Sequence, residues 1–127
     1  FKKVAHACSS APLTYKRSCF ESMGRDVGGV YRGRPGEAIT ACSNAPYGEL
    51  RTGCLTGAAQ DAFWDPSGQD EALKFCKILN DTGEKSACYN IIFGRAPEVL
   101  SSKAELQNFC SKAEIEFQNS CLERIQS

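Results

Sequence analysis

The sequence predicts an all-α fold of four stacked helical hairpins, and three observations support it: a cysteine repeat, turn residues inside each repeat and helical spacing of apolar residues. Two cysteines recur per repeat, and the pairs are Cys8 and Cys19, Cys42 and Cys54, Cys76 and Cys88, and Cys110 and Cys121. The first cysteines follow one another at intervals of 34 residues. Such a period is typical of helix–turn–helix units that bury their apolar faces by stacking. We expect one domain, residues 1–127, with units at about 1–30, 31–64, 65–98 and 99–127 and about eight short helices, as an α-solenoid or a compact bundle.

The third unit has the clearest helix boundaries. Its first helix is predicted over residues 69–79, after the turn residues 65–68, and the run Asn80-Asp81-Thr82-Gly83 ends it. Its second helix is predicted from about residue 84 to residue 93, where Gly94 closes the helix in the left-handed conformation. In the fourth unit, Ser102 and Glu105 have the spacing of a capping box, in which each side chain bonds a free backbone amide.

The first unit is predicted to begin with a helix from Phe1 to Cys8 that turns Val4 and Ala7 toward the core. The second helix covers about residues 13–25. Its apolar residues recur at helical spacing and predict a core stripe of Tyr15, Phe20, Met23 and Val27.

The second unit follows a glycine-rich segment, residues 27–36, which is predicted as a flexible connection or, because of its arginines, as an anion site. Pro35 suits the start of a helix over residues 37–42. The next helix, about residues 47–63, is rich in glycine and alanine, which favours close packing against a neighbouring helix.

The cysteines of each pair lie on either side of a turn, so two antiparallel helices would bring them to the same level. This favours disulfides within the hairpins. Cys110 and Cys121 lack a strong helix breaker between them and also suit one face of a continuous helix. Eight cysteines allow 105 pairings. An alternative pairing stays open, with bridges Cys19–Cys42, Cys54–Cys76 and Cys88–Cys110. It would leave Cys8 and Cys121 unpaired.

Disulfides imply an oxidising compartment, so we expect a secreted or periplasmic protein or one from a similar compartment. The alternative is that the cysteines are buried free thiols or metal ligands. The chain begins at Phe1 rather than Met, which suggests a processed protein or a fragment. No apolar run approaches the length needed to span a membrane.

The charge pattern argues against nucleic-acid binding, because the formal net charge is zero and nucleic acids require a dominant basic surface. The charge is nevertheless uneven, with a basic first third followed by an acidic second unit. This asymmetry could guide end-to-end assembly or docking of an oppositely charged partner.

Catalytic signals are few, so we expect no enzyme activity and no cofactor. The chain has one histidine, His6, and no patterned serine or aspartate accompanies it. Thioredoxin-like, haem-attachment and zinc-protease motifs are absent from the sequence. The cysteine spacing is poor for zinc, and no metal site is predicted. Cu(I) held by thiolates along a helical bundle is the alternative function, and a small enzyme is a distant third.

The layout of 34-residue hairpins with two cysteines each resembles disulfide-linked tetratricopeptide or Sel1-like repeats, although the alanine, glycine and tyrosine signatures of those repeats are mostly missing. It is also similar to the twin-cysteine hairpins of the mitochondrial intermembrane space, whose cysteines are separated by nine residues rather than ten or eleven. Neither resemblance assigns a binding residue.

The function that this architecture favours is non-catalytic recognition, scaffolding or assembly, because repeat stacks present extended surfaces to partners. A lone tryptophan at a helix end, Trp64, either caps the local core or anchors a partner. Equivalent repeat positions place the two longer connections along one edge. The predicted contact residues for a protein partner or for self-association are Tyr31, Arg32, Arg34, Trp64 and Asp65.

Overall fold

The computed structural model describes residues 1–126, and in this range the chain is entirely helical, which confirms the predicted fold class. The helices are α1 (Lys2–Ser9), α2 (Leu13–Val30), α3 (Pro35–Cys42), α4 (Glu49–Ala62), the 3-10 turn η1 (Pro66–Gly68), α5 (Gln69–Ile78), α6 (Thr82–Val99), α7 (Lys103–Ser111) and α8 (Ile115–Ile125). Each odd-numbered helix is followed by a longer even-numbered partner. The two form one hairpin, which we call a unit.

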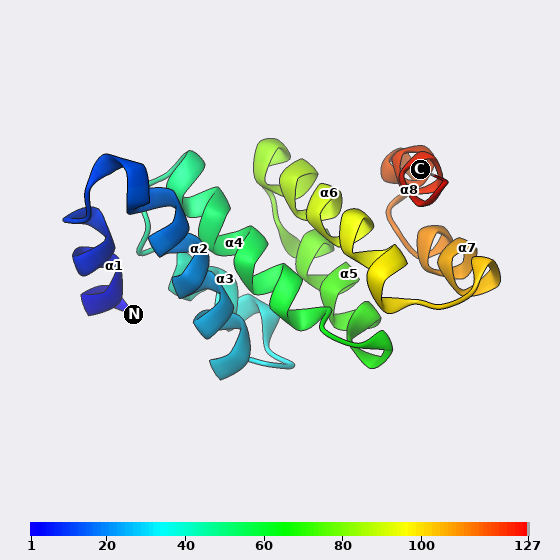
Figure 1. Ribbon diagram of the computed structural model, residues 1–127, viewed down its shortest axis with the longest axis horizontal. Coiled ribbons are helices and arrows are strands. Elements are labelled where there is room, and N and C mark those ends of the chain that lie inside the picture. The colour runs from blue at the N-terminus through cyan, green and yellow to red at the C-terminus, as the bar shows by residue number, and fades with distance from the viewer. Residues whose placement is uncertain (127) are drawn as a thin grey trace.

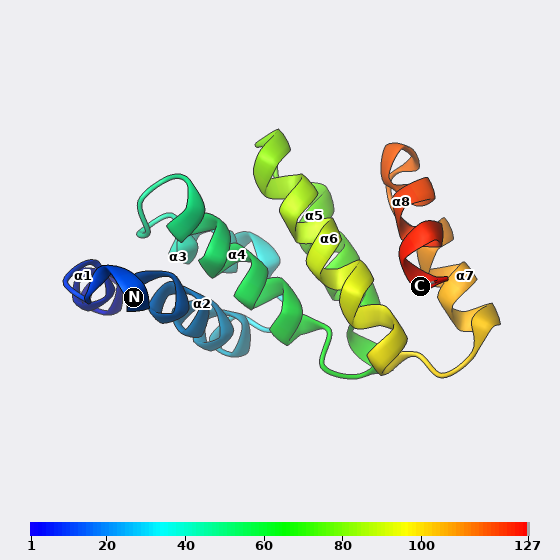
Figure 2. The same cartoon turned by 45° about the horizontal axis from the view of Figure 1, so that its top comes forward.

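The four units lie side by side in chain order, so the first and last helices are at opposite ends of an elongated molecule (Figure 1). The even-numbered helices α2, α4, α6 and α8 form one row, in which each contacts the next. The turns between units lie along one edge of the stack, and the turns inside units lie along the opposite edge (Figure 2). Residues at the same position in successive units therefore meet across each junction.

Each unit is closed by one disulfide, as the preferred pairing predicted. The bridges are Cys8–Cys19, Cys42–Cys54, Cys76–Cys88 and Cys110–Cys121, with Cα–Cα distances of 5.5–5.6 Å. The alternative pairing across the longer connections is wrong. The fourth pair spans a real break, because α7 ends at Ser111 and α8 begins at Ile115. Four disulfides indicate an oxidising compartment.

Helices α2 and α4 make the most extensive contact in the molecule, because glycines bring their backbones together. A β-carbon on Gly24 would overlap the carbonyl oxygen of Cys54, and one on Gly57 would lie 2.5 Å from the carbonyl oxygen of Glu21. Real β-carbons do not approach other atoms so closely. The close packing expected of the second unit is thus confirmed, and its partner is α2.

Aromatic side chains fill the core at the other end of the stack. Phe63 at the end of α4 stacks on Phe109 of α7, with ring centroids 5.2 Å apart. Phe93 of α6 meets Phe109 edge-on at 6.1 Å. All three rings are buried, so they join units two, three and four into one continuous core.

Two helix ends differ from the sequence prediction. Helix α2 continues past residue 25 to Val30, so the first four residues of the supposed flexible segment are helical. Helix α6 continues through Gly94 to Val99 and includes Pro97. Gly94 has no positive φ. The helix continues because Ala96, in the next turn, is fully buried and holds it against the core.

The predicted core positions of the first unit are partly wrong. Val4 is 41% exposed and Tyr15 is 64% exposed, whereas Phe20, Met23 and Val27 are buried as predicted. Ala7 is also exposed, and Ala5 and Cys8 face the core instead. Ala5 and Cys8 are three residues apart and share the inward face of α1, whereas Ala7 lies about a quarter turn away from Cys8.

The first turns of α7 and α6 are capped by polar side chains that precede them in the sequence. The Ser102 hydroxyl accepts a hydrogen bond from the Glu105 amide at 3.1 Å, which is the predicted cap of α7. The Glu105 carboxylate accepts from the hydroxyls of Ser101 and Ser102 rather than from a backbone amide. Asp81 caps α6 in the same way, by accepting from the Glu84 amide. None of the helices within residues 1–126 combines the length and apolarity that crossing a membrane requires.

Candidate functional site

The predicted contact residues gather where the turn between α2 and α3 meets the end of α4. The Arg32 guanidinium donates to the Asp61 carboxylate at 2.8 Å. The same guanidinium lies over the Trp64 ring, 5.9 Å from its centroid. The Gly33 amide, at a positive φ of 79°, donates to the Glu71 carboxylate of the third unit. The structure therefore brings the two predicted segments together and fixes them with polar contacts.

Tyr31 and Arg34 extend this surface toward the first helix. The Arg34 guanidinium lies 5.3 Å from the centre of the Tyr31 ring and forms an ion pair with Glu37 at 2.8 Å. The Tyr31 ring contacts the ring of Phe1, with centroids 6.1 Å apart. Two arginine–aromatic pairs, Arg34 with Tyr31 and Arg32 with Trp64, thus lie on the edge formed by the turns between units. We call these four residues the turn edge.

Trp64 does not fill the core, because 58% of its surface is exposed. Its backbone carbonyl accepts from Arg95 at 3.5 Å, and the carbonyl of Phe63 accepts from Arg95 at 3.1 Å. The indole is therefore held by its backbone and by Arg32 while its ring faces solvent. Asp65 has a local role, since its carboxylate accepts from the Ser67 amide at 2.9 Å and caps η1.

A second set of polar contacts joins the units near the starts of the even-numbered helices. Each junction has one ion pair from a basic residue to a carboxylate of the next unit; the pairs are Arg17–Glu49 at 2.8 Å, Arg51–Glu84 at 2.6 Å and Lys85–Glu114 at 2.9 Å. Sequence reasoning missed this series. The signal was available, because every basic member stands two or three residues before the second cysteine of its unit.

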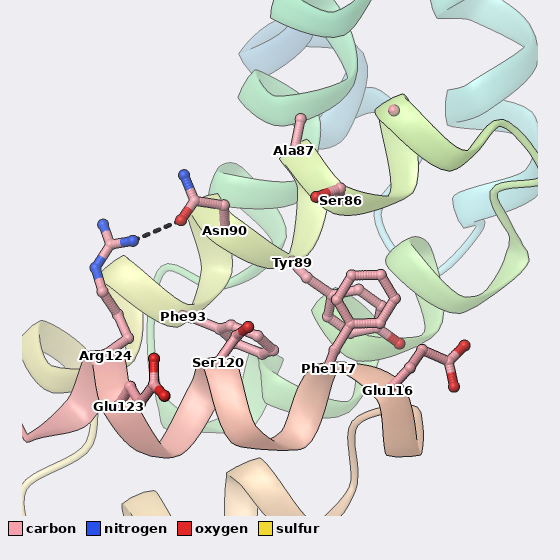
Figure 3. A pocket seen from close by; sticks show the side chains of 11 residues that line it. Ser86, Ala87, Tyr89, Asn90, Phe93, Glu116, Phe117, Ser120, Glu123 and Arg124 are labelled. Atoms are coloured by element: carbon pink, nitrogen blue, oxygen red, sulfur yellow. Dashed lines mark hydrogen bonds between the residues drawn. The ribbon is translucent and has the colours of Figure 1, made fainter.

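A hollow with a volume of about 730 Å³ lies between α6 and α8 (Figure 3). We call it the α6–α8 groove. Its aromatic floor is formed by Tyr89, Phe93 and Phe117, and Tyr89 stacks on Phe117 with centroids 4.4 Å apart. At one end the Arg124 guanidinium donates to the Asn90 side-chain oxygen at 2.6 Å. Sequence analysis assigned no role to these residues.

The groove lies beside a partly buried polar contact between Tyr89 of its floor and Glu114. The Tyr89 hydroxyl donates to the Glu114 carboxylate at 2.9 Å. Burial raises the pKa of Tyr89 strongly, and its hydrogen bond to Glu114 and the nearby charge of Glu116 raise it further. Tyr89 therefore stays neutral and donates a hydrogen bond to Glu114. Glu116 and Glu123 on α8 supply carboxylates at the rim.

The alternative metal-binding function requires thiolates, and every cysteine of the chain is in a disulfide. Within residues 1–126, no group of three or more histidine, cysteine, aspartate or glutamate side chains is placed to hold a metal ion. His6 is exposed on α1.

Comparison with protein-family models, with curated proteins and with solved structures found no significant match.

Proposed function

We propose that the protein is a non-catalytic recognition or scaffolding module that works in a secreted, periplasmic or similar oxidising compartment and binds a protein partner through the turn edge. The observation that carries the proposal is the contact between Arg32 and Trp64, which holds a 58% exposed indole at the junction of two units. Tryptophan, tyrosine and arginine are the residues that most often dominate binding energy at protein interfaces. Tyr31 and Arg34 provide a second such pair beside them.

The pre-formed geometry of the turn edge supports binding because a fixed side chain loses little entropy when a partner docks. The ion pair of Arg32 with Asp61 ties the turn between the first two units to α4, and the Gly33 amide ties the same turn to Glu71 in α5 of the third unit. The surface is thus rigid across three units. The balanced charge of the chain accords with a protein partner rather than a nucleic acid.

The test compares Trp64→Ala and Arg32→Ala with Tyr15→Ala, a control aromatic that is 64% exposed on α2. A photoreactive amino acid at position 64 or position 15 is used to cross-link the disulfide-bonded protein in the exported-protein fraction of its source organism. We expect one partner, which can be a second copy of the chain, to cross-link at position 64 only. Its affinity should fall at least tenfold in both turn-edge variants and stay unchanged in Tyr15→Ala. Equal affinity in all variants would refute the proposal.

A further inference from the structure

The α6–α8 groove exists because the residues that pack α2 against α4 are larger at the last junction. Gly53 and Gly57 of α4 stand one residue before and three residues after Cys54. Both glycines face the preceding helix, α2. At the last junction the corresponding positions are Ser120 and Arg124 of α8, and the Arg124 guanidinium lies against Gly94 of α6. A side chain rather than backbone therefore fills this part of the junction. Helices α6 and α8 accordingly make a much smaller contact than α2 and α4.

The groove has the length of a short peptide. Its lining on α6 extends from Gly83 to Phe93, and the ten residue-to-residue steps between them cover about 15 Å of helix. An extended segment of about four or five residues has the same length. Because α6 and α8 both present residues at helical spacing along this length, the groove is continuous rather than a single point of contact (Figure 3).

The groove offers both an apolar floor and polar groups that the protein itself does not use. The ring of Phe117 is partly exposed beside the buried rings of Tyr89 and Phe93. Within residues 1–126, the side chains of Ser86, Glu116 and Ser120 form no hydrogen bond or ion pair. All three line the groove, so hydrogen-bonding groups are available along both walls.

The charge of the rim determines which occupant fits. Glu116 and Glu123 lie seven residues apart on the same side of α8, and both line the groove. Among the described residues that line the groove, Arg124 is the one basic group, and its guanidinium is bonded to Asn90. A basic side chain placed near Glu116 would gain a charge-assisted hydrogen bond, whereas an acidic one would be repelled.

We propose that the α6–α8 groove binds an extended segment of a partner protein that carries a lysine or arginine for Glu116 and an apolar side chain for Phe117. This site is separate from the turn edge and extends the proposed function by a second recognition surface.

The probe is a set of fluorescent five-residue peptides with alternating leucine and lysine, together with matched peptides in which glutamate replaces lysine. Binding is measured by fluorescence anisotropy at low and high salt. We expect the basic peptides to bind, the acidic peptides not to bind, and salt to weaken binding because the contact is electrostatic.

Two variants test the location. Glu116→Lys reverses the rim charge, and Ser120→Trp fills the hollow. Asp26→Lys is the matched control, since Asp26 is an exposed acid on α2 that forms no ion pair within residues 1–126. We expect each groove variant to weaken binding of the basic peptides at least tenfold and the control to leave it unchanged, with circular dichroism confirming the fold of all three. Binding that is unaffected by both groove variants, preference for acidic peptides, or no binding at millimolar peptide would overturn the proposal. Trp64→Ala should leave peptide binding in the groove intact. The groove proposal and the turn-edge proposal can therefore fail independently of each other.

Discussion

Gly24 of α2 lies directly against the carbonyl oxygen of Cys54 in α4, with no space between them for a β-carbon. The contact joins the first two units through their backbones, beside the Cys42–Cys54 disulfide that closes the second unit. Gly28 is similarly close to Ala58, so the approach continues along the helix. Packing in this half of the stack therefore depends on the absence of side chains.

Gly24→Ala should destabilise the protein by about 1–3 kcal/mol or more, because the added methyl group forces α2 away from α4. Gly29→Ala is the matched control, since Gly29 is in the same helix and a β-carbon there meets no atom within 4 Å. Alanine has the higher helix propensity, so this variant should be neutral or gain up to about 1 kcal/mol. Urea unfolding with intact disulfides measures both. Equal stability of the two variants would show that the helices are not in contact as described.

Arg51→Met should cost about 1.5–3 kcal/mol, because it leaves the Glu84 carboxylate without its charged partner. The Arg51 guanidinium donates to Glu84 at 2.6 Å, and the Glu84 side chain is only 8% exposed. Glu49→Gln breaks the equivalent Arg17–Glu49 pair, in which the Glu49 side chain is 72% exposed. Exposed pairs contribute less than about 1 kcal/mol. Urea unfolding should therefore show a larger loss of unfolding free energy for Arg51→Met than for Glu49→Gln. A similar loss in both variants would contradict the role of burial.

The fold could be predicted from the sequence because its main constraint is periodic. Four cysteine pairs at one interval define the units, and the turn between Cys76 and Cys88 places both cysteines at the same level of two antiparallel helices. Individual helix ends were harder to predict. Gly94 is a frequent stop signal, but burial of Ala96 outweighs the intrinsic preference of one glycine.

The candidate sites were predictable only in part. Tyr31, Arg32, Arg34 and Trp64 could be placed on one edge because repeat positions are equivalent, and the structure brings them into contact. The α6–α8 groove could not be predicted in this way. It results from side-chain volumes on two helices about thirty residues apart in the chain, and a single sequence contains no direct measure of helix separation.

Stability should depend on pH through Glu114. Partial burial alone would raise its pKa, but hydrogen bonds from Lys85 and Tyr89 outweigh burial and hold the pKa of Glu114 below its usual value. A carboxylate with a lowered pKa stabilises the fold fully above the pKa of the unfolded chain, about 4.3. That stabilisation is lost as the pH falls through the lower pKa of the folded state.

Glu114→Gln should therefore be about 1.5–3 kcal/mol less stable than the wild type at pH 7, and the difference should shrink between pH 5 and pH 2. Urea unfolding at several pH values measures it. Glu116→Gln is the control, because the Glu116 side chain is exposed and forms no ion pair within residues 1–126. A constant difference across this pH range would show that Glu114 is not the titrating group.

The disulfide Cys8–Cys19 should be the first to be reduced under native conditions. Cys19 is partly exposed, whereas the other seven cysteines are buried. Thiol–disulfide exchange requires access of the attacking thiolate to sulfur. The closed loops differ by only one residue, with separations of 11 or 12, so loop entropy does not distinguish the bridges.

Limited reduction with a graded dithiothreitol series, followed by alkylation and peptide mass mapping, checks this order. Before reductant is added, all eight cysteines should resist alkylation. At the lowest effective concentration, labels should appear on Cys8 and Cys19 alone. The same series in concentrated urea is the control, and there the four bridges should be reduced at similar rates because the folded structure no longer shields them. Simultaneous reduction of all four bridges without urea would mean that the whole stack opens before any single sulfur becomes accessible.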